Sequence, residues 1–153
     1  MKKLPQKYVI VELIPNHSNY KIGYIVQLQA IKVNNNKIID RLDLRVDDSL
    51  VENKDLLSMI SYDKEMFNYT KDTNYIMKEL IKFIDNDKLL IINNYYTEGY
   101  LSEVKNKKEN VFDYLDLKIS DNVFDELIAK YKLEPSNHLV DLLYEAIVFE
   151  NSK

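Results

Sequence analysis

The segment Tyr8-Val9-Ile10-Val11-Glu12-Leu13-Ile14 decides the fold class of this chain. Six of its seven residues are apolar or aromatic, which is typical of a strand that is buried on both faces. We expect the strand to run from Lys7 to Ile14 and to end at Pro15, because proline has no N–H to donate to a neighbouring strand. Glu12 interrupts this pattern. An ionised carboxylate on a buried strand is costly unless a cation, a metal or hydrogen bonds compensate it, so Glu12 marks a candidate site.

A second apolar stretch, Lys88 to Ile92, predicts another buried strand, most simply parallel to the first. It runs into the polar segment Asn93-Asn94-Tyr95-Tyr96-Thr97, and the next residue is Glu98. Two acids at the ends of buried strands indicate a common functional site more readily than an accident of sequence.

Between these strands, residues 20–33 and 37–46 are rich in β-forming residues. Asn34-Asn35-Asn36 separates them, and asparagine tolerates a positive φ better than any residue except glycine. The pattern predicts an antiparallel meander of three strands.

The remaining chain has helical periodicity and loops. We expect a short helix over 53–61 and a longer helix after a cap at Asp72 or Thr73. Further along, the pattern predicts a short helix over 98–104, a charged surface loop over 105–110, a short fifth strand over 111–117, and closing helices over 122–131 and 137–149. These elements make a mixed α/β domain that covers residues 1–153.

The composition narrows the function classes. A formal charge of -4 disfavours a protein that wraps phosphate backbones, although it leaves room for a local basic patch. There is no cysteine, which excludes disulfides and thiolate chemistry. The sequence shows neither a signal peptide nor a membrane span, so we expect a cytoplasmic protein without a membrane partner.

The order of the expected elements and several short sequence segments within them resemble the DEDDh branch of the DnaQ-like 3′–5′ exonucleases, which have an RNase H-like fold. The similarity covers nearly the whole chain. It is clearest at Ala30 to Val33 with Lys37 to Asp40, at Ile60 to Phe67, at Leu89 to Glu98, and at Phe124 to Phe149. The resemblance implies a mixed sheet, built from a three-strand antiparallel meander plus parallel strands, with flanking helices.

In that family four carboxylates hold two divalent metals, and a histidine acts as general base. Carried over residue by residue, the first Asp becomes Glu12 and its Glu partner becomes Ile14. The second Asp becomes Glu98, the histidine is matched by His138, and the last Asp falls on Leu143. The chain thus departs from the family pattern at all four carboxylates.

These departures differ in severity. Glu12 and Glu98 keep the charge but move the oxygens by one methylene, which suits the octahedral geometry of Mg²⁺ poorly. Ile14 and Leu143 offer no ligand. Asp141 and Glu145 lie two residues on either side of Leu143, a helical rotation of roughly 200°, so both should point away from the metal side.

Each candidate also has a plainer interpretation. Glu12 is either a relic of a metal site or a residue in a salt bridge or solvated at a strand end. Glu98 is either a relic or a first-turn acid that complements a helix dipole. His138 is a relic, a weak general base or an exposed first-turn residue, and Tyr95 and Tyr96 either stack on bases or pack.

The leading hypothesis is a catalytically degenerate exonuclease-like domain, a pseudoenzyme that acts as a binding or regulatory module in nucleic-acid processing. A protein partner is favoured, a nucleic acid is possible, and no cofactor is expected. The alternative is an active exonuclease with a reduced site of Glu12, Glu98 and His138, with Asp141 or Glu145 reaching in, that uses Mg²⁺ or Mn²⁺. A third hypothesis is homo-oligomerisation through tyrosine-rich surface; the sequence leaves the oligomeric state open.

Overall fold

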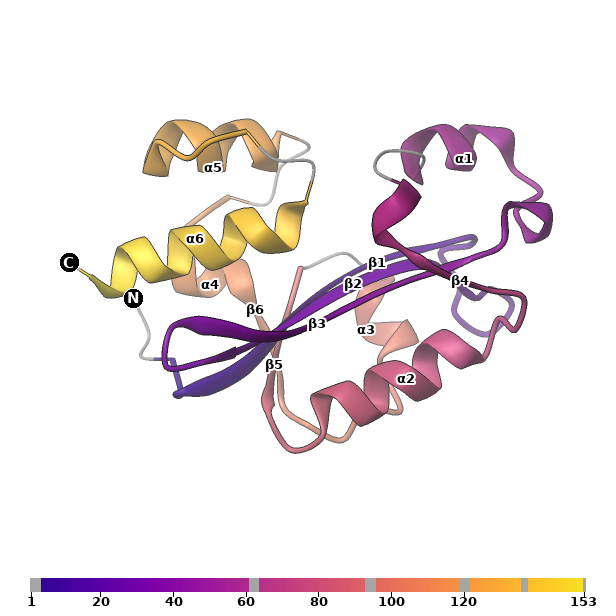
Figure 1. The fold of residues 1–153 in the computed structure, drawn as a ribbon, viewed down its shortest axis with the longest axis horizontal. Helices are drawn as coiled ribbons and strands as arrows, with labels where there is room; N and C mark the ends of the chain where they lie inside the picture. Colours follow the sequence, from indigo (N-terminus) through magenta and orange to yellow (C-terminus); the bar gives the residue numbers. More distant parts are fainter. Residues whose placement is uncertain (1–3, 61–63, 93–95, 119–121, 136–137, 153) are drawn as a thin grey trace.

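The computed structural model describes residues 4–60, 64–92, 96–118, 122–135 and 138–152. Within these ranges the strands form one mixed sheet in the order β4-β3-β2-β1-β5-β6 (Figure 1). The strands are β1 (Lys7–Pro15), β2 (Ile25–Asn34), β3 (Lys37–Val46), β4 (Asn68–Thr70), β5 (Lys88–Ile91) and β6 (Lys108–Asn110).

The predicted meander is confirmed. β1 pairs antiparallel with β2, and β2 pairs antiparallel with β3. At the tight turn between β2 and β3, Asn35 and Asn36 have φ values of 52° and 62°. Two successive left-handed residues match the twist of the flanking strands, and asparagine adopts this conformation at low cost.

The expected parallel strand is confirmed as well. β5 pairs parallel with β1, with Tyr8 opposite Lys88 and Val11 opposite Ile91. Two short strands extend the sheet at its edges: β6 lies parallel to β5, and β4 lies parallel to β3. The sequence pattern did not predict β4.

Helices cover the sheet on opposite sides. The described helices are α1 (Lys54–Ile60), α2 (Tyr75–Ile84), α3 (Thr97–Tyr100), α4 (Val111–Leu115), α5 (Val123–Tyr131) and α6 (Leu139–Asn151), with the 3₁₀ turns η1 (Asp48–Leu50) and η2 (Lys64–Met66). Figure 1 shows α5 and α6 on one side of the sheet and α2 on the other.

The prediction for residues 105–117 was wrong. The expected strand over 111–117 contains helix α4, which begins at Val111. The side chain of Asn110 caps it by accepting a hydrogen bond from Phe112 N at 2.9 Å. The expected loop contains β6, where Glu109 pairs with Lys88 Nζ at 2.8 Å and Lys107 Nζ at 3.1 Å. These ion pairs compensate the charge of a sequence that local propensity assigns to a loop.

Two apolar cores lie on the two faces of the sheet. Residues along β1 alternate between them: Val9, Val11 and Leu13 belong to the core that includes α2, whereas Tyr8 and Ile10 belong to the core that includes α4, α5 and α6. Because side chains alternate along a strand, Glu12 belongs to the face that α6 covers. Within the described ranges, no helix has both the length and the apolar character that a membrane crossing requires.

Candidate functional site

Three neighbouring strands place polar side chains in one row across the sheet. Glu12 of β1 is directly opposite Gln29 of β2, and Gln29 is directly opposite Asp43 of β3. Residues opposite each other in an antiparallel pair share a face, with Cβ atoms about 4.5–5.5 Å apart. The row therefore lies on the α6 side of the sheet, beyond the apolar residues Tyr8 and Ile10.

His138, at the start of α6, contacts the middle of this row. Gln29 Nε2 lies 3.0 Å from His138 Nδ1 and donates to Asp43 Oδ1 at 3.3 Å. An amide nitrogen only donates, so the Gln29 amide engages His138 Nδ1 as an acceptor in the tautomer that leaves this nitrogen unprotonated.

Arg41 links the row to α6. It lies two residues before Asp43 on β3 and therefore shares the same face. Its Nε donates to Asp43 Oδ2 at 3.0 Å, while Nη1 and Nη2 donate to the two oxygens of Asp141 at 2.8 and 2.7 Å. We call the set formed by Glu12, Gln29, Arg41, Asp43, His138 and Asp141 the polar cluster.

The pKa values reflect this burial and pairing. Desolvation by burial raises the pKa of Glu12 from its ordinary 4.5 to about 7. The residue as a whole keeps partial exposure, but Oε2 is buried and lacks a hydrogen-bond partner among the described residues, as does Gln29 Oε1. Desolvation also raises the pKa of Asp43, against the opposing effect of Arg41. The hydrogen bonds from Arg41 to Asp141 raise the arginine pKa.

The structure brings together only some of the residues that the sequence nominated. Glu12 and His138 both adjoin Gln29. Glu98 is exposed in the first turn of α3, and within the described part of the chain no hydrogen bond or ion pair joins it to the polar cluster. Tyr96 is half-buried and packs on the core of the α2 side, while Tyr95 lies outside the described residues.

The positions that replace carboxylates are apolar and lie in different cores. Leu143 is fully buried on the α6 side, whereas Ile14 is half-buried against the core of the α2 side. Asp141, which we expected to point away, pairs with Arg41 at the edge of the polar cluster.

These residues do not fit a two-metal site. Among the described residues, no group of three or more His, Asp and Glu side chains has an arrangement that could hold a metal ion. Asp43 and Asp141 both direct oxygens at the guanidinium of Arg41. Glu12 alone cannot supply the set of oxygen ligands that Mg²⁺ requires.

Sequence reasoning missed Gln29, Arg41 and Asp43. A signal was present, because polar residues alternate in β2 at Gln27 and Gln29 and in β3 at Arg41, Asp43 and Arg45. Polar residues at a spacing of two share one face, and in a central strand that face is buried.

No protein-family model matches this chain, and no curated protein matches it significantly. Among solved structures, exonuclease I in complex with the inhibitor BCBP matches with a TM-score of 0.59 and 10% identity, over 96% of this chain and 41% of that one. An ExoI/SSB-Ct complex matches with a TM-score of 0.62 and 9% identity, over 95% of this chain and 40% of the other. Escherichia coli exonuclease I with a dA16 oligonucleotide matches with a TM-score of 0.56 and 8% identity, over 94% of this chain and 40% of that one.

The chain has an exonuclease-like, RNase H-type fold. This agreement confirms the predicted fold class: a mixed α/β sheet with antiparallel and parallel strands, flanked by helices. At such low identity the likeness concerns the fold alone. The chain spans about two fifths of the exonuclease I chains that it matches.

Proposed function

We propose that this exonuclease-like domain is catalytically degenerate and acts as a binding or regulatory module in nucleic-acid processing. The single observation that carries the proposal is the Arg41 guanidinium between Asp43 and Asp141. An arginine side chain stays protonated at any physiological pH, so it provides these carboxylates with a permanent internal cation.

Three further features support this proposal. Among the described residues no ion pair joins Glu12 to a cation, and burial raises its pKa to about 7, which disfavours the charged carboxylate that a metal needs. His138 has its Nδ1 engaged with Gln29, which is a poor starting point for a general base. Ile14 and Leu143 have apolar side chains at two positions where the exonuclease pattern has metal-binding carboxylates.

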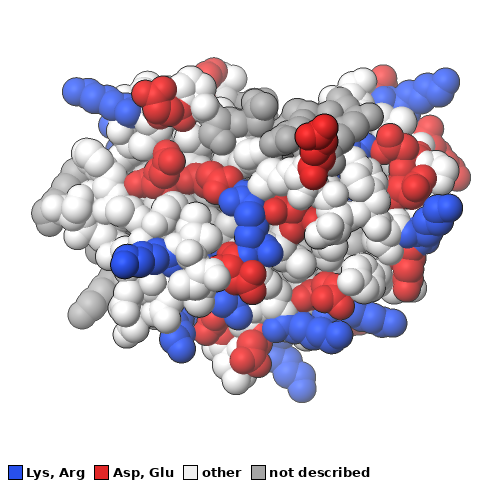
Figure 2. All heavy atoms as spheres, viewed as in Figure 1, with Lys and Arg blue, Asp and Glu red and all other residues white. Residues whose placement is uncertain are grey.

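A protein partner is favoured over a nucleic acid. The formal charge of the chain is -4. Figure 2 shows basic and acidic side chains interspersed on the face it displays, without a broad basic field that could follow a phosphate backbone. The structural neighbours include both an ExoI/SSB-Ct complex and a complex with a dA16 oligonucleotide, so both partner classes are compatible with the fold.

The test is incubation of the purified protein with end-labelled single-stranded DNA and RNA in the presence of Mg²⁺ or Mn²⁺. We expect the labelled strands to keep their length. A Glu12→Ala variant purified in parallel controls for contaminating nucleases. Stepwise shortening by the natural chain that disappears in this variant would overturn the proposal.

The alternative function is an active exonuclease with a reduced metal site. The proximity of Glu12 and His138, both adjoining Gln29, is the observation that favours it. It requires divalent-metal binding, which calorimetric titration with Mn²⁺ at millimolar concentration measures directly. The absence of heat would count against this alternative.

A further inference from the structure

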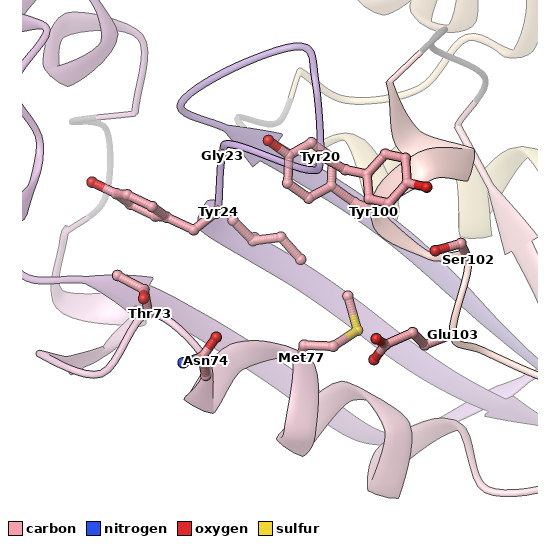
Figure 3. Close-up of a pocket in the computed structure, with 10 residues that line it drawn as sticks. Tyr20, Gly23, Tyr24, Thr73, Asn74, Met77, Tyr100, Ser102 and Glu103 are labelled. Carbon is pink, nitrogen blue, oxygen red and sulfur yellow. The ribbon is translucent and has the colours of Figure 1, made fainter.

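A groove follows helix α2 on the side that faces residues 100–106. One cavity of about 200 Å³ lies between Asn74 and Met77 on one wall and Tyr100 and Glu103 on the other (Figure 3). A second cavity of about 290 Å³ continues beside Ile81 and also includes Glu103. Residues 74, 77, 81 and 84 all line these cavities, and their spacing places them along one helix face. The two cavities are neighbours along α2 and share Glu103, and together we call them the groove.

The first cavity is lined by aromatic rings, a thioether, one carboxylate and the neutral polar side chains of Thr73, Asn74 and Ser102. Its aromatic residues are Tyr20, Tyr24 and Tyr100, and Glu103 is the one charged side chain among its lining residues. Figure 3 shows the Glu103 carboxyl group beside the Met77 side chain at the rim.

Two of the three tyrosine hydroxyl groups in this cavity already have partners. Tyr24 Oη donates to the carbonyl oxygen of Leu50, and Tyr100 Oη donates to that of His17. For a ligand there remain the ring surfaces, the neutral polar groups of Thr73, Asn74 and Ser102, and the negative charge of Glu103. Such surfaces attract a cation on a long apolar stem, as in lysine and arginine side chains, and they repel phosphate.

The wall of this cavity is pre-organised. The rings of Tyr20 and Tyr100 pack edge to face with centroids 6.4 Å apart. Both glycines of the chain lie at this contact: a Cβ on Gly99 would lie 2.6 Å from Tyr20 Cδ1, and a Cβ on Gly23 would collide with Tyr100 Oη. Tyr100 is also held by its hydrogen bond to the carbonyl oxygen of His17, and a fixed ring lowers the ordering cost of binding a flexible side chain.

The second cavity suits an aliphatic side chain. Ile81, Ile84 and Val104 provide its apolar surface, while Asp85 and Lys105 offset each other's charge. Met77 and Ile81, one in each cavity, are separated by about one helical turn, roughly 6 Å. Alternate side chains of an extended peptide are separated by about 6.7 Å, which is close to this spacing.

We infer that this groove docks an extended segment of a partner protein in which a Lys or Arg and an aliphatic residue stand two positions apart. The basic side chain occupies the first cavity with its charge at Glu103, and the aliphatic side chain occupies the second. The inference rests on the proposed function, which assigns the module a protein partner, and it specifies the chemistry of that partner.

The test is an NMR titration of ¹⁵N- and methyl-¹³C-labelled protein with the peptide acetyl-Gly-Lys-Ala-Ile-Gly-amide. We expect the methyl signals of Met77 and Ile81 to shift with a dissociation constant of about a millimolar, as suits a short flexible ligand. Glu103→Gln should weaken binding at least about threefold, because it removes the charge that the lysine meets. Glu134→Gln is the matched control, since it makes the same charge change at an exposed residue after α5, on the other side of the sheet, and should leave binding unchanged.

Three results would overturn the inference: no shift at Met77 and Ile81, equal binding of a peptide with glutamate in place of lysine, or stronger shifts of the same methyl groups with an eight-nucleotide oligothymidylate. The outcome is separable from that of the nuclease assay. Nuclease activity would contradict the proposed function whatever the result of the peptide titration. Absence of nuclease activity together with absence of peptide binding would contradict only the inferred docking at the groove.

Discussion

Arg41 on β3 and Asp141 on α6, exactly one hundred positions apart in the chain, form two parallel hydrogen bonds of 2.8 and 2.7 Å. The same guanidinium reaches Asp43, so one arginine connects a central strand of the sheet to the last helix. The side chains of Arg41 and Asp141 are 30% and 25% exposed, so solvent screens this pair only partly. Bidentate pairs of this kind combine energy with a fixed geometry.

Breaking this pair should destabilise the protein. We expect Arg41→Met to lower the free energy of unfolding by about 2–3 kcal/mol, because Asp43 and Asp141 lose their charged partner together. Asp141→Asn should cost about 1–2 kcal/mol, since it keeps the shape but removes the charge. Urea unfolding of both variants and of the double variant gives the coupling energy of the pair.

The pair of Glu79 and Lys82 provides the comparison for this cycle. Lys82 is 76% exposed and its Nζ lies 3.5 Å from Glu79 Oε1. Exposed helix pairs contribute only about 0.3–0.5 kcal/mol. A coupling energy between Arg41 and Asp141 as small as that of this pair would contradict the role that we assign to Arg41.

Glu12 should make stability depend on pH. Its pKa rises from 4.5 in the unfolded chain to about 7 in the folded protein, so the folded state holds the proton more tightly. The stabilisation that this tighter proton binding gives the folded state is fully present below pH 4.5 and is lost as the pH rises through about 7. The loss is on the order of 3 kcal/mol.

Unfolding free energies at several pH values between 4 and 8 test this prediction. Other groups also titrate, so the informative quantity is the difference between the natural chain and Glu12→Gln, which has no proton to exchange. That difference should change with pH in the range 4.5–7 and become constant above it. Parallel profiles of the two proteins would show that Glu12 is not responsible.

The sequence predicted most of the fold because its strongest signals are local. The run from Tyr8 to Ile14, the asparagine turn at Asn35 and Asn36, and the apolar period of α2 each determine one element, and each was confirmed. The failures occur where local propensity conflicts with tertiary pairing. Residues 108–110 form an edge strand because Lys88 of β5 compensates Glu109, which a local pattern does not reveal.

The candidate site could be predicted only in part. Glu12 stood out because it interrupts an apolar strand, and His138 because of its place before the last helix. The sequence did not indicate Arg41 as a site residue, because its role depends on a contact with Asp141, one hundred positions away in the chain. Its contact depends on where α6 crosses the sheet, and no local pattern contains that information.

Divalent metals should leave the stability almost unchanged. With 5 mM Mn²⁺ we expect the unfolding temperature to change by less than about 2 °C. A site with a dissociation constant of 5 mM or weaker would stabilise the fold by at most about 0.4 kcal/mol. The reason is the donor set in the described part of the chain: Asp43 and Asp141 are paired with Arg41, which leaves Glu12 as the remaining carboxylate of the polar cluster. Calorimetric scans with Mn²⁺ and then with excess chelator measure the change, and a chelator-reversible rise of several degrees would contradict it.

The contact between Gly23 and Tyr100 should be intolerant of a side chain. In a Gly23→Ala variant the new methyl group would collide with Tyr100 Oη, which is held by its hydrogen bond to the carbonyl oxygen of His17. We expect a loss of about 1–3 kcal/mol in the free energy of unfolding, the usual cost of overpacking. Gly99→Ala should cost less than about 1 kcal/mol. Its clash is with the ring of Tyr20, which is 43% exposed and can move outward, and alanine favours helix α3.

A second substitution identifies the cause. Tyr100→Phe removes the oxygen that the methyl group would meet, so Gly23→Ala should cost clearly less in this background than in the natural chain. Urea unfolding of the single and double variants measures the difference. An equal cost in both backgrounds would place the strain elsewhere, for example at Asn16 Oδ1, which would lie 2.9 Å from the same methyl group.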